Sequence, residues 1–415
     1  MTIALAPARG QETPAEPPPP FNDAALYSMT MASGTSVNPQ SFGMPMLMRR
    51  IGSWNLMFMG QAFVADTQQS GPRGGDKLYS LNAFMISAEH GLGKGSVTLE
   101  TMLSLEPATV TGERYPLLFQ TGETAYGMPL ADAQHPHDFL MGLGVEYTRP
   151  LSEHSMLQMY YAPVGDPALG PVAFPHRASA ADLPQAPLGH HWQDSTHLAD
   201  NVATVALKYR WLRLEASGFH GAEPDEYRWD IDWGAMDSYA GRLSVFPSKN
   251  WMAQISAGRI AGPERQTPGD VVRATASLHY TRPMGFGNAW STSVIWGRNH
   301  DTFTRRDLNS YLAETVYPVR RKNFLTGRIE RVDKDELFAD DPALEAQLAR
   351  SAGSTFRIAA YTVGYTRDLG AFRDVETGVG ANVTAYTVPA AIRPYYGARP
   401  FGVTMYVRLR LKHAR

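Results

Sequence analysis

Half of the twelve histidines in this 415-residue chain fall in two long segments, residues 106–138 and 162–200. The first segment carries a His-Pro-His string, which places both imidazoles on one side of an extended chain. In the second, His190, Asp194 and His197 share one face if their stretch makes a helical turn. Imidazole with carboxylate is a donor set for Zn²⁺, Cu²⁺ or Ni²⁺. The candidate metal ligands are His135, His137, Asp138, His176, His190, His191, Asp194 and His197.

The alternative for these eight residues is a network of loop side chains. In that case His and Asp hydrogen-bond backbone groups and fold the two segments into a pore. Loops of more than thirty residues are expected to be functional or to fold inward. Both interpretations require the two segments to meet in space, and we expect them to do so.

A second group of possible ligands is formed by methionines near the N-terminus. They recur at a spacing of two, which aligns them on one face of an extended chain: Met29 with Met31, Met44 with Met46 and Met48, and Met57 with Met59. Thioethers select Cu(I), so a copper site is one interpretation. Methionine is also an adaptable apolar filler, which favours a Met-rich segment, residues 21–50, lying in or under the lumen of a barrel.

Enzyme motifs are absent from the sequence. There is no Gly-x-Ser-x-Gly elbow, phosphate-binding loop, His-Glu-x-x-His pair or dinucleotide fingerprint, and there is no cysteine. His279 with the nearby Ser277 is a formal candidate for a hydrolase site inside a barrel, although a hydrogen-bonded lumen histidine is the simpler interpretation. We therefore expect that the protein is not an enzyme.

The elements that must position these side chains are strands. From residue 53 onward the apolar period is two, and in residues 403–411 Val, Met, Val, Leu and Leu share one face while Thr, Tyr and two Arg share the other. Sixteen such segments of about 9 to 13 residues occur, the length that a tilted strand needs to cross a bilayer. They begin near Ser53, Lys77, Ser96, Phe139, Ser155, Asn201, Trp211, Ser238, Trp251, Val271, Ala289, Leu308, Asn323, Phe356, Val375 and Gly402.

The connections between these segments alternate between short and long. Outer-membrane barrels have short periplasmic turns and longer external loops, whereas a soluble sandwich has no reason to sort its loops. An aromatic residue followed by Arg recurs before the short connections, as in Tyr147 to Arg149 and Tyr280 to Arg282, which is typical of an interfacial aromatic girdle. The pattern predicts a transmembrane antiparallel β-barrel of about 16 strands over residues 51–415.

The faces opposite the apolar ones carry charges of both signs, which indicates a polar lumen with water, paired networks, or both. By parity the lumen-lining residues include Glu100, Glu146, Arg213, Glu215, Arg242, Arg273, Arg408 and Arg410.

Composition agrees with this architecture. Hydrophobic residues make up 43% of the chain, mean hydropathy is −0.28, and no run approaches the roughly 18 apolar residues of a membrane helix. The net charge of −2 and the lack of a basic tract exclude nucleic acid as an expected partner. Residues 1–20 are interpreted as a clipped signal followed by a Pro-rich leader.

The architecture resembles that of general and substrate-selective porins. More specifically, residues 33–36, 69–76, 116–124, 134–138, 171–177 and 189–197 resemble strings of an uncharacterised family of exported Gram-negative proteins. The last strand resembles the terminal signal of outer-membrane proteins, except that it ends in Leu411 and a basic tail. The resemblance implies the cell outer membrane as the location, with its lipid, lipopolysaccharide and barrel assembly machinery as partners.

Two functions from different classes follow as expectations. The first is a porin-like channel for small solutes or ions in which His-rich loops fold inward. The alternative is a copper- or zinc-binding tolerance protein whose lumen is plugged, with one of these metals as the possible bound ion. A lumenal hydrolase is a distant third.

Overall fold

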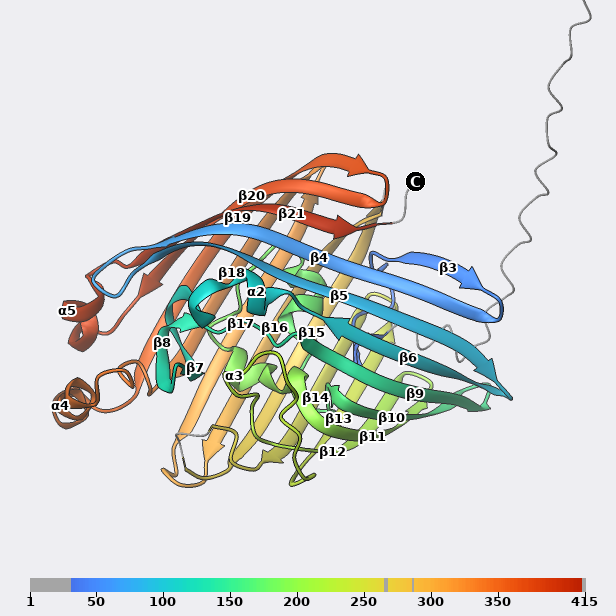
Figure 1. Cartoon of the computed structure of the whole chain (residues 1–415), viewed down its shortest axis with the longest axis horizontal. Coiled ribbons are helices and arrows are strands. Elements are labelled where there is room, and N and C mark those ends of the chain that lie inside the picture. The colour runs from blue at the N-terminus through green and yellow to red at the C-terminus, as the bar shows by residue number, and fades with distance from the viewer. Residues whose placement is uncertain (1–30, 265–267, 286, 413–415) are drawn as a thin grey trace, which may run out of the picture.

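The computed structural model describes residues 31–264, 268–285 and 287–412 of the chain. Its main feature is a closed antiparallel barrel of 16 strands, seen in Figure 1 as the band of long arrows. In chain order the barrel strands are β4 (Trp54–Gln69), β5 (Asp76–Leu92), β6 (Gly95–Leu103), β9 (Leu140–Ser152), β10 (Ser155–Gly165), β11 (Ala199–Tyr209), β12 (Leu212–Phe219), β13 (Ser238–Ser248), β14 (Trp251–Ile260), β15 (Val271–Gly285), β16 (Asn288–Asp301), β17 (Asp307–Val319), β18 (Asn323–Lys334), β19 (Phe356–Phe372), β20 (Val375–Thr387) and β21 (Phe401–Leu411). The predicted fold class is confirmed, and each strand begins within two residues of its expected start.

The barrel closes where β21 pairs with β4, in the register Val407↔Val64 and Thr404↔Thr67. The short strand β3 (Leu47–Ile51) runs along the same edge of β4 beyond the end of β21, with Met48↔Met57. No helix among the described residues is both long enough and apolar enough to cross a membrane.

The exposure of side chains along each strand is the reverse of that in a soluble protein. In β21, Met405 is 49% exposed and Leu409 is 37% exposed, while Arg408 between them is fully buried. Near the short turns, the rings of Trp251, Tyr280, Trp290 and Tyr317 form a row with neighbouring centroids 4.6, 5.3 and 5.7 Å apart. An apolar outer surface bordered by aromatic rings is the surface that a bilayer requires.

Eight long connections lie at one end of the barrel. We number them L1 (70–75), L2 (104–139), L3 (166–198), L4 (220–237), L5 (261–270), L6 (302–306), L7 (335–355) and L8 (388–400). Their short elements are α2 (Glu106–Thr109), η1 (Thr111–Glu113), β7 (Tyr115–Ala125) and β8 (Met128–Gln134) in L2, η2 (Phe174–His176), η3 (Ala178–Ala180), α3 (His190–Gln193) and η4 (Ser195–Leu198) in L3, α4 (Pro342–Ala352) in L7, and η5 (Ala390–Ile392) and α5 (Arg393–Tyr396) in L8.

Loop L2 contains a hairpin that the sequence pattern does not reveal. Strands β7 and β8 pair with each other in a separate two-stranded sheet, and their register shifts twice because of bulges. These bulges interrupt the period of two, which is why residues 106–138 read as a loop. Phe119 of β7 packs against Tyr386 and Tyr396, with ring centroids 5.0 and 4.4 Å apart, so an aromatic core fixes the hairpin at the outer mouth.

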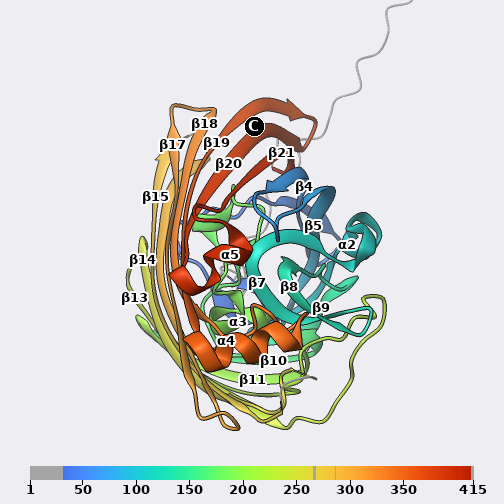
Figure 2. The ribbon, with the colours of Figure 1, turned by 90° about the vertical axis from the view of Figure 1, so that its left-hand side faces the viewer.

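The interior of the barrel is filled. Figure 2, which looks in from the end where α4 and α5 lie, shows β7, β8, α3 and α5 within the ring of strands. Nearly all of L3 is buried, and we call this loop the plug. Beneath it lies the N-terminal segment with strands β1 (Met31–Ser33) and β2 (Ser36–Val37). Asn38 ties the two together, because its amide donates to the carbonyl of His176 at 3.0 Å and accepts from the amide of Ala178 at 3.2 Å.

Candidate functional site: the histidines between L2 and the plug

The two His-bearing loops meet inside the barrel. Ring contacts run from His135 to His191 (6.2 Å between centroids), from His191 to His190 (5.3 Å), from His190 to His197 (5.3 Å) and from His197 to His137 (5.5 Å). Five predicted histidines therefore form one continuous row, in which L2 contributes the two end rings and the plug contributes the three rings between them.

Helix α3 is fixed to the barrel wall by its backbone. Arg273 of β15 donates to the carbonyl of His191 at 2.6 Å, and Asn299 of β16 donates to the same carbonyl at 3.0 Å. Gly297 of β16 makes room for the helix, because a Cβ there would lie 2.1 Å from the carbonyl oxygen of Trp192. The wall thus sets the height and rotation of the His190–His191 pair.

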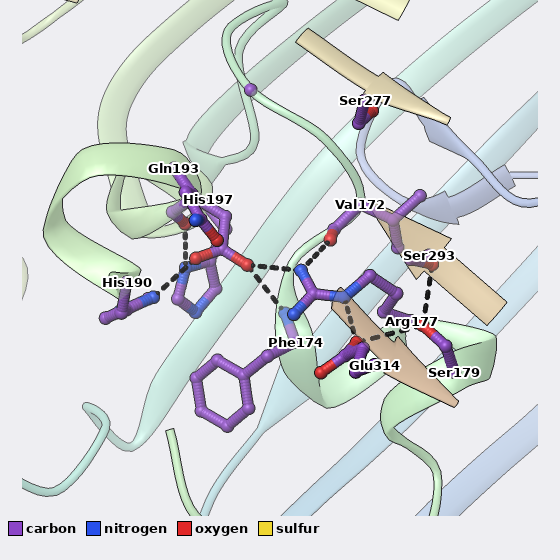
Figure 3. Close-up of polar contacts among 12 residues, drawn as sticks. Val172, Phe174, Arg177, Ser179, His190, Gln193, His197, Ser277, Ser293 and Glu314 are labelled. Carbon is purple, nitrogen blue, oxygen red and sulfur yellow. Dashed lines mark hydrogen bonds and ion pairs between the residues drawn. The ribbon is translucent and has the colours of Figure 1, made fainter. Parts of the chain in front are cut away.

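Asp194 joins several parts of the plug, among them Phe174, Arg177, His190 and His197, which are labelled in Figure 3. One carboxylate oxygen lies 2.7 Å from Nδ1 of His190, and the other accepts from Arg177 and from the amide of Phe174, both at 2.9 Å. The backbone carbonyl of Asp194 lies 2.8 Å from Nδ1 of His197. Asp194 and His190 therefore form part of the structural network expected as the alternative to a metal site.

Arg177 connects the plug to strand β17, the neighbour of β16 in the barrel wall. Its guanidinium is fully buried and donates at 2.6 Å to Glu314 of β17, which also accepts from Arg328 at 2.9 Å. Ser179 donates to the same carboxylate at 2.9 Å and lies 2.6 Å from the hydroxyl of Ser293 (Figure 3). A guanidinium shared between two carboxylates is a strong and directional link in a water-poor interior.

Two imidazoles and three carboxylates converge at the outer end of the histidine row. Nε2 of His135 lies 2.7 Å from Oε1 of Glu123, and Nδ1 of His191 lies 3.3 Å from Glu223 and 3.9 Å from Glu264. Ligand atoms of Glu123, His135 and His191 lie within 4.8 Å of one another, as do those of His191, Glu223 and Glu264. We call these five residues the outer cluster; they come from L2, L3, L4 and L5.

The hairpin in L2 is shaped to present this cluster. The bulge between Thr121 and Thr124 places Gly122 at φ 115° and Glu123 at φ 61°. A non-glycine residue at positive φ is strained, and such strain is found at functional sites. Gly122 is required here because a Cβ would lie 2.6 Å from Cε1 of the His191 ring.

Electrostatic effects differ from one histidine of the row to the next. Burial lowers the pKa of His190 to about 4 and outweighs the neighbouring Asp194. Burial acts in the same direction on His191, but the carboxylates of Glu223, Glu264 and Glu123 outweigh burial and raise its pKa to about 9. At the two ends of the row, burial lowers the pKa of His135, whereas Glu106 raises the pKa of His137 against the effect of burial.

The remaining predicted ligands lie elsewhere. Asp138 accepts from Arg228 of L4 at 3.2 Å, and burial raises the pKa of Asp138 to about 7. Nδ1 of His137 lies 3.0 Å from Glu106 of α2. His176 lines the cavity beneath the plug. None of these three reaches the outer cluster.

The predicted methionine set is dispersed. Met29 lies outside the described residues. Met31 packs against Phe246 and Met252, whereas Met44 lines the cavity beneath the plug. Met46 directly precedes β3 and Met48 lies within it. The methionines that do gather are on the barrel wall, on strands β4, β5, β6 and β9, and form an apolar cluster of Met59, Met85, Met102 and Met141.

The lumen-facing charges form ion pairs with one another and with the plug. Arg213 lies 3.2 Å from Glu215, and Arg242 donates to both oxygens of Glu215 at 2.9 Å. Arg408 contacts Asp182 of the plug as well as Asp368, and Arg410 donates to Glu376 at 2.7 Å. Glu100 accepts from Tyr160 at 3.0 Å, and Glu146 accepts from Thr148 at 2.7 Å.

Cavities lie on both sides of the plug. The outer one, of about 250 Å³, is an acidic vestibule among L2, L4, L5 and L7, lined by Glu123, Glu223, Asp225, Glu264, Glu336 and Glu345. The inner one, of about 350 Å³, opens toward the short turns and reaches Arg177 and His176. A small cavity of about 50 Å³ shares Gln61, Ala83 and Pro175 with the inner cavity and reaches His137. The histidine row lies between these spaces.

The candidate hydrolase pair has an unsuitable arrangement. Nε2 of His279 lies 2.8 Å from the hydroxyl of Ser277, and Nδ1 lies 2.7 Å from that of Ser293. A catalytic imidazole needs an acidic group behind the nitrogen that does not face the nucleophile. Serine occupies both sides here, and no carboxylate contacts this ring among the described residues.

Sequence reasoning did not find the three glutamates of the outer cluster. Glu123, Glu223 and Glu264 lie in three different loops, and none has an informative spacing to a histidine. Only Gly122 beside Glu123 carried a local signal, a glycine inside a string of otherwise strand-forming residues.

Structural comparison finds barrels of the same kind. An anion-selective porin from Comamonas acidovorans is 12% identical, with 86% of this chain and 100% of that chain covered and a TM-score of 0.50. OmpF of Salmonella typhi, in a complex with daunomycin, is 9% identical with 88% and 100% covered and a TM-score of 0.49. The outer-membrane channel DcaP of Acinetobacter baumannii is 8% identical with 88% and 99% covered and a TM-score of 0.48. No protein-family model and no curated protein matches the chain.

At these identities the likeness extends to the fold alone. The closed barrel of 16 strands, its apolar outer surface and its sorted loops define an outer-membrane β-barrel with the porin architecture. The protein therefore lies in the outer membrane of a Gram-negative cell and spans it with sixteen strands.

Proposed function

We propose that the protein is a porin-type channel for small cations, which the plug holds closed in the conformation described above. The observation that supports this proposal is the pair of cavities, about 250 Å³ outside and about 350 Å³ inside, separated by a single folded loop. A barrel that only anchors a binding site has no need for an open space on the periplasmic side of its plug.

The charge of the outer vestibule favours cations. Its lining contains six carboxylic acids and no Lys or Arg among the described residues. A mouth lined by one sign of charge concentrates ions of the opposite sign and excludes the others.

The plug has the attachments of a movable element. Beside the apolar contacts of Leu169, Leu188 and Trp192, its contacts with the wall include hydrogen bonds and ion pairs, such as Arg177 to Glu314 and Arg408 to Asp182. Such contacts have discrete alternatives, because both partners can be solvated when water enters the lumen. Opening then joins the vestibule to the inner cavity along the histidine row.

Conductance in planar bilayers tests the proposal. The protein should show discrete openings whose reversal potential in a KCl gradient indicates cation preference, and Glu345→Gln at the vestibule should reduce that preference. A deletion of residues 171–196 should conduct continuously and serves as proof of an intact barrel. If the wild type stays silent at every voltage while the deletion variant conducts, the proposal is overturned.

The expected alternative, a metal-binding barrel, is supported by one specific observation. The outer cluster has the donor set for a transition-metal ion and lies at the base of the acidic vestibule.

A further inference from the structure

We propose that Glu123, His135, His191, Glu223 and Glu264 form a binding site for one divalent first-row transition-metal ion at the outer face of the plug. The inference deepens the proposed function by naming the class of cation that enters the vestibule. Binding itself requires only the closed conformation, so it can be measured separately from conductance.

Each of the two triads has a geometry that fits one ion. All ligand atoms within each triad lie within 4.8 Å of one another, and His191 belongs to both. An ion with metal–ligand distances of about 2.0–2.2 Å holds its ligands roughly 3 to 4 Å apart, so shifts of less than about 1 Å close either triad. The bound ion would draw loops L2, L3, L4 and L5 together.

His135 already has the orientation of a metal ligand. Its Nδ1 lies 3.0 Å from the carbonyl of Pro136, which can only accept, so Nδ1 carries the proton. In the neutral ring, the lone pair of Nε2 then faces both the side-chain amide of Gln134 at 2.9 Å and Oε1 of Glu123 at 2.7 Å. Two lone pairs at that distance repel each other unless a proton or a cation lies between them. A backbone carbonyl that fixes the tautomer is the usual second partner of a metal-bound imidazole.

His191 lacks the hydrogen bonds that a structural histidine would have. It is 6% exposed, and among the described residues neither Nδ1 nor Nε2 has a hydrogen-bond partner. Its 3.3 Å approach to Glu223 does not have hydrogen-bond geometry, and Oε2 of Glu223 also lacks a partner. Leaving buried polar atoms unpaired costs about 1–3 kcal/mol each, so their convergence at one point indicates a ligand.

The histidines of the inner row provide the contrast. One ring nitrogen of His190 is bonded to Asp194, one of His137 to Glu106 and one of His197 to the carbonyl of Asp194, although Nε2 of His197 has no hydrogen-bond partner among the described residues. A purely structural role for the whole row would have given His191 a similar partner, because Asn299 and Arg273 stand nearby and instead hold its backbone carbonyl.

Charge favours a cation. Three carboxylates contact the two imidazoles, and among the described residues Arg228 pairs with one of them, Glu123. A cluster in which carboxylates outnumber the neighbouring guanidinium group attracts a cation. Imidazole nitrogen with carboxylate oxygen suits Zn²⁺, Fe²⁺, Ni²⁺ or Mn²⁺, and no thiolate is available to favour a softer ion.

Zinc binding to the full-length protein in detergent, purified without a histidine tag, tests the site. Titration with ZnCl₂ after chelation should give one ion per chain. The Glu264→Gln variant should bind at least tenfold more weakly, and the double variant His135→Ala with His191→Ala should not bind. His176→Ala is the matched control, because this histidine is also buried with a free Nε2 but lies outside the cluster.

Heat-modifiable migration on a gel shows whether the barrel of each variant has folded. If the double variant does not fold, Glu264→Gln still tests the site, because the Glu264 side chain is 24% exposed and its replacement should not disturb folding. Zinc stoichiometry that is equal in the wild type and all folded variants, or absent from the wild type, overturns the site. If the protein binds zinc but shows no conductance, the metal site is supported and the channel proposal is overturned.

Discussion

The hydroxyl oxygens of Ser179 and Ser293 lie 2.6 Å apart, and this contact joins the plug to the barrel wall. Ser179 belongs to η3 inside the lumen, whereas Ser293 belongs to β16. The chain contains no cysteine, so a variant with cysteine at both of these positions can form only this one disulfide within the chain. Atoms at hydrogen-bond distance need only a small shift to form an S–S bond of about 2.05 Å.

Oxidation of the double variant Ser179→Cys with Ser293→Cys should abolish channel openings, because the plug is then bound covalently to the wall. Reduction with dithiothreitol should restore openings to the level of the wild type. The measurement is single-channel recording on one membrane before and after reduction.

The matched control is Thr281→Cys with Ser291→Cys. These residues are cross-strand partners on β15 and β16 with hydroxyls 3.1 Å apart, so their disulfide joins wall to wall and leaves the plug free. Equal conductance of the oxidised and reduced plug variant would show that L3 does not move during conduction.

The buried ion pairs of Arg177 should dominate the stability of the plug. Arg177→Met leaves Glu314 and Asp194 with one cation fewer, and such a loss costs about 3–5 kcal/mol. Adding Glu314→Gln should recover part of that loss. Urea unfolding followed by tryptophan fluorescence measures both changes. Arg357→Met serves as the control, because the pair of Arg357 with Asp333 is largely exposed on the Arg side and should contribute about 1 kcal/mol or less.

Gly122→Ala should weaken zinc binding while it leaves every proposed ligand in place. The new methyl group meets the ring of His191 at 2.6 Å and must displace it, and we expect a loss of about 10- to 100-fold in affinity. Gly127→Ala is the control, since Gly127 also has positive φ but its Cβ would meet nothing within 4 Å. The same affinity in both variants would contradict the position assigned to His191.

The topology predicts which residues face the medium. A cysteine at Tyr227 in L4, whose side chain is exposed, should react with a membrane-impermeant maleimide on intact cells. A cysteine at Lys249, in a short turn, should react only after the outer membrane is permeabilised. The reverse labelling pattern would show that the barrel has the opposite orientation in the outer membrane.

The strands were predictable from sequence because each one alternates between lipid and lumen. In β21, for example, the period of two is a direct consequence of contact with two different solvents. The same logic identified the lumen-facing parity of Arg408 and Arg213. It could not identify their partners, because ion pairs such as that of Arg408 with Asp182 join residues 226 positions apart.

The candidate site was predictable only in part. Clustering of histidines in L2 and L3 correctly indicated that these loops meet, since His135 and His191 are in ring contact. The predicted ligands did not include residues from further loops. Glu223 and Glu264 reach the site because L4 and L5 fold over the mouth of the barrel. The backbone amide of Glu223 donates to the carbonyl of Pro263 at 2.9 Å, and no sequence pattern indicates this contact. Conversely, Asp138 and Asp194, which were predicted as ligands, accept hydrogen bonds from Arg228 and Arg177.

The seam between β4 and β21 determines the order in which the protein can be assembled. Thr67 and Thr404, whose hydroxyls meet across it at 2.8 Å, are 337 residues apart, so the circle closes only after the last strand has been delivered. The plug is attached to strands on opposite sides of the barrel, such as β13 and β21. Its buried charged residues could not pass through a barrel wall that is already closed. We expect the interior to fold first, as a template around which the strands are laid. Trapping assembly intermediates by a Val64→Cys with Val407→Cys cross-link should therefore yield no closed barrel in which L3 is still open to protease.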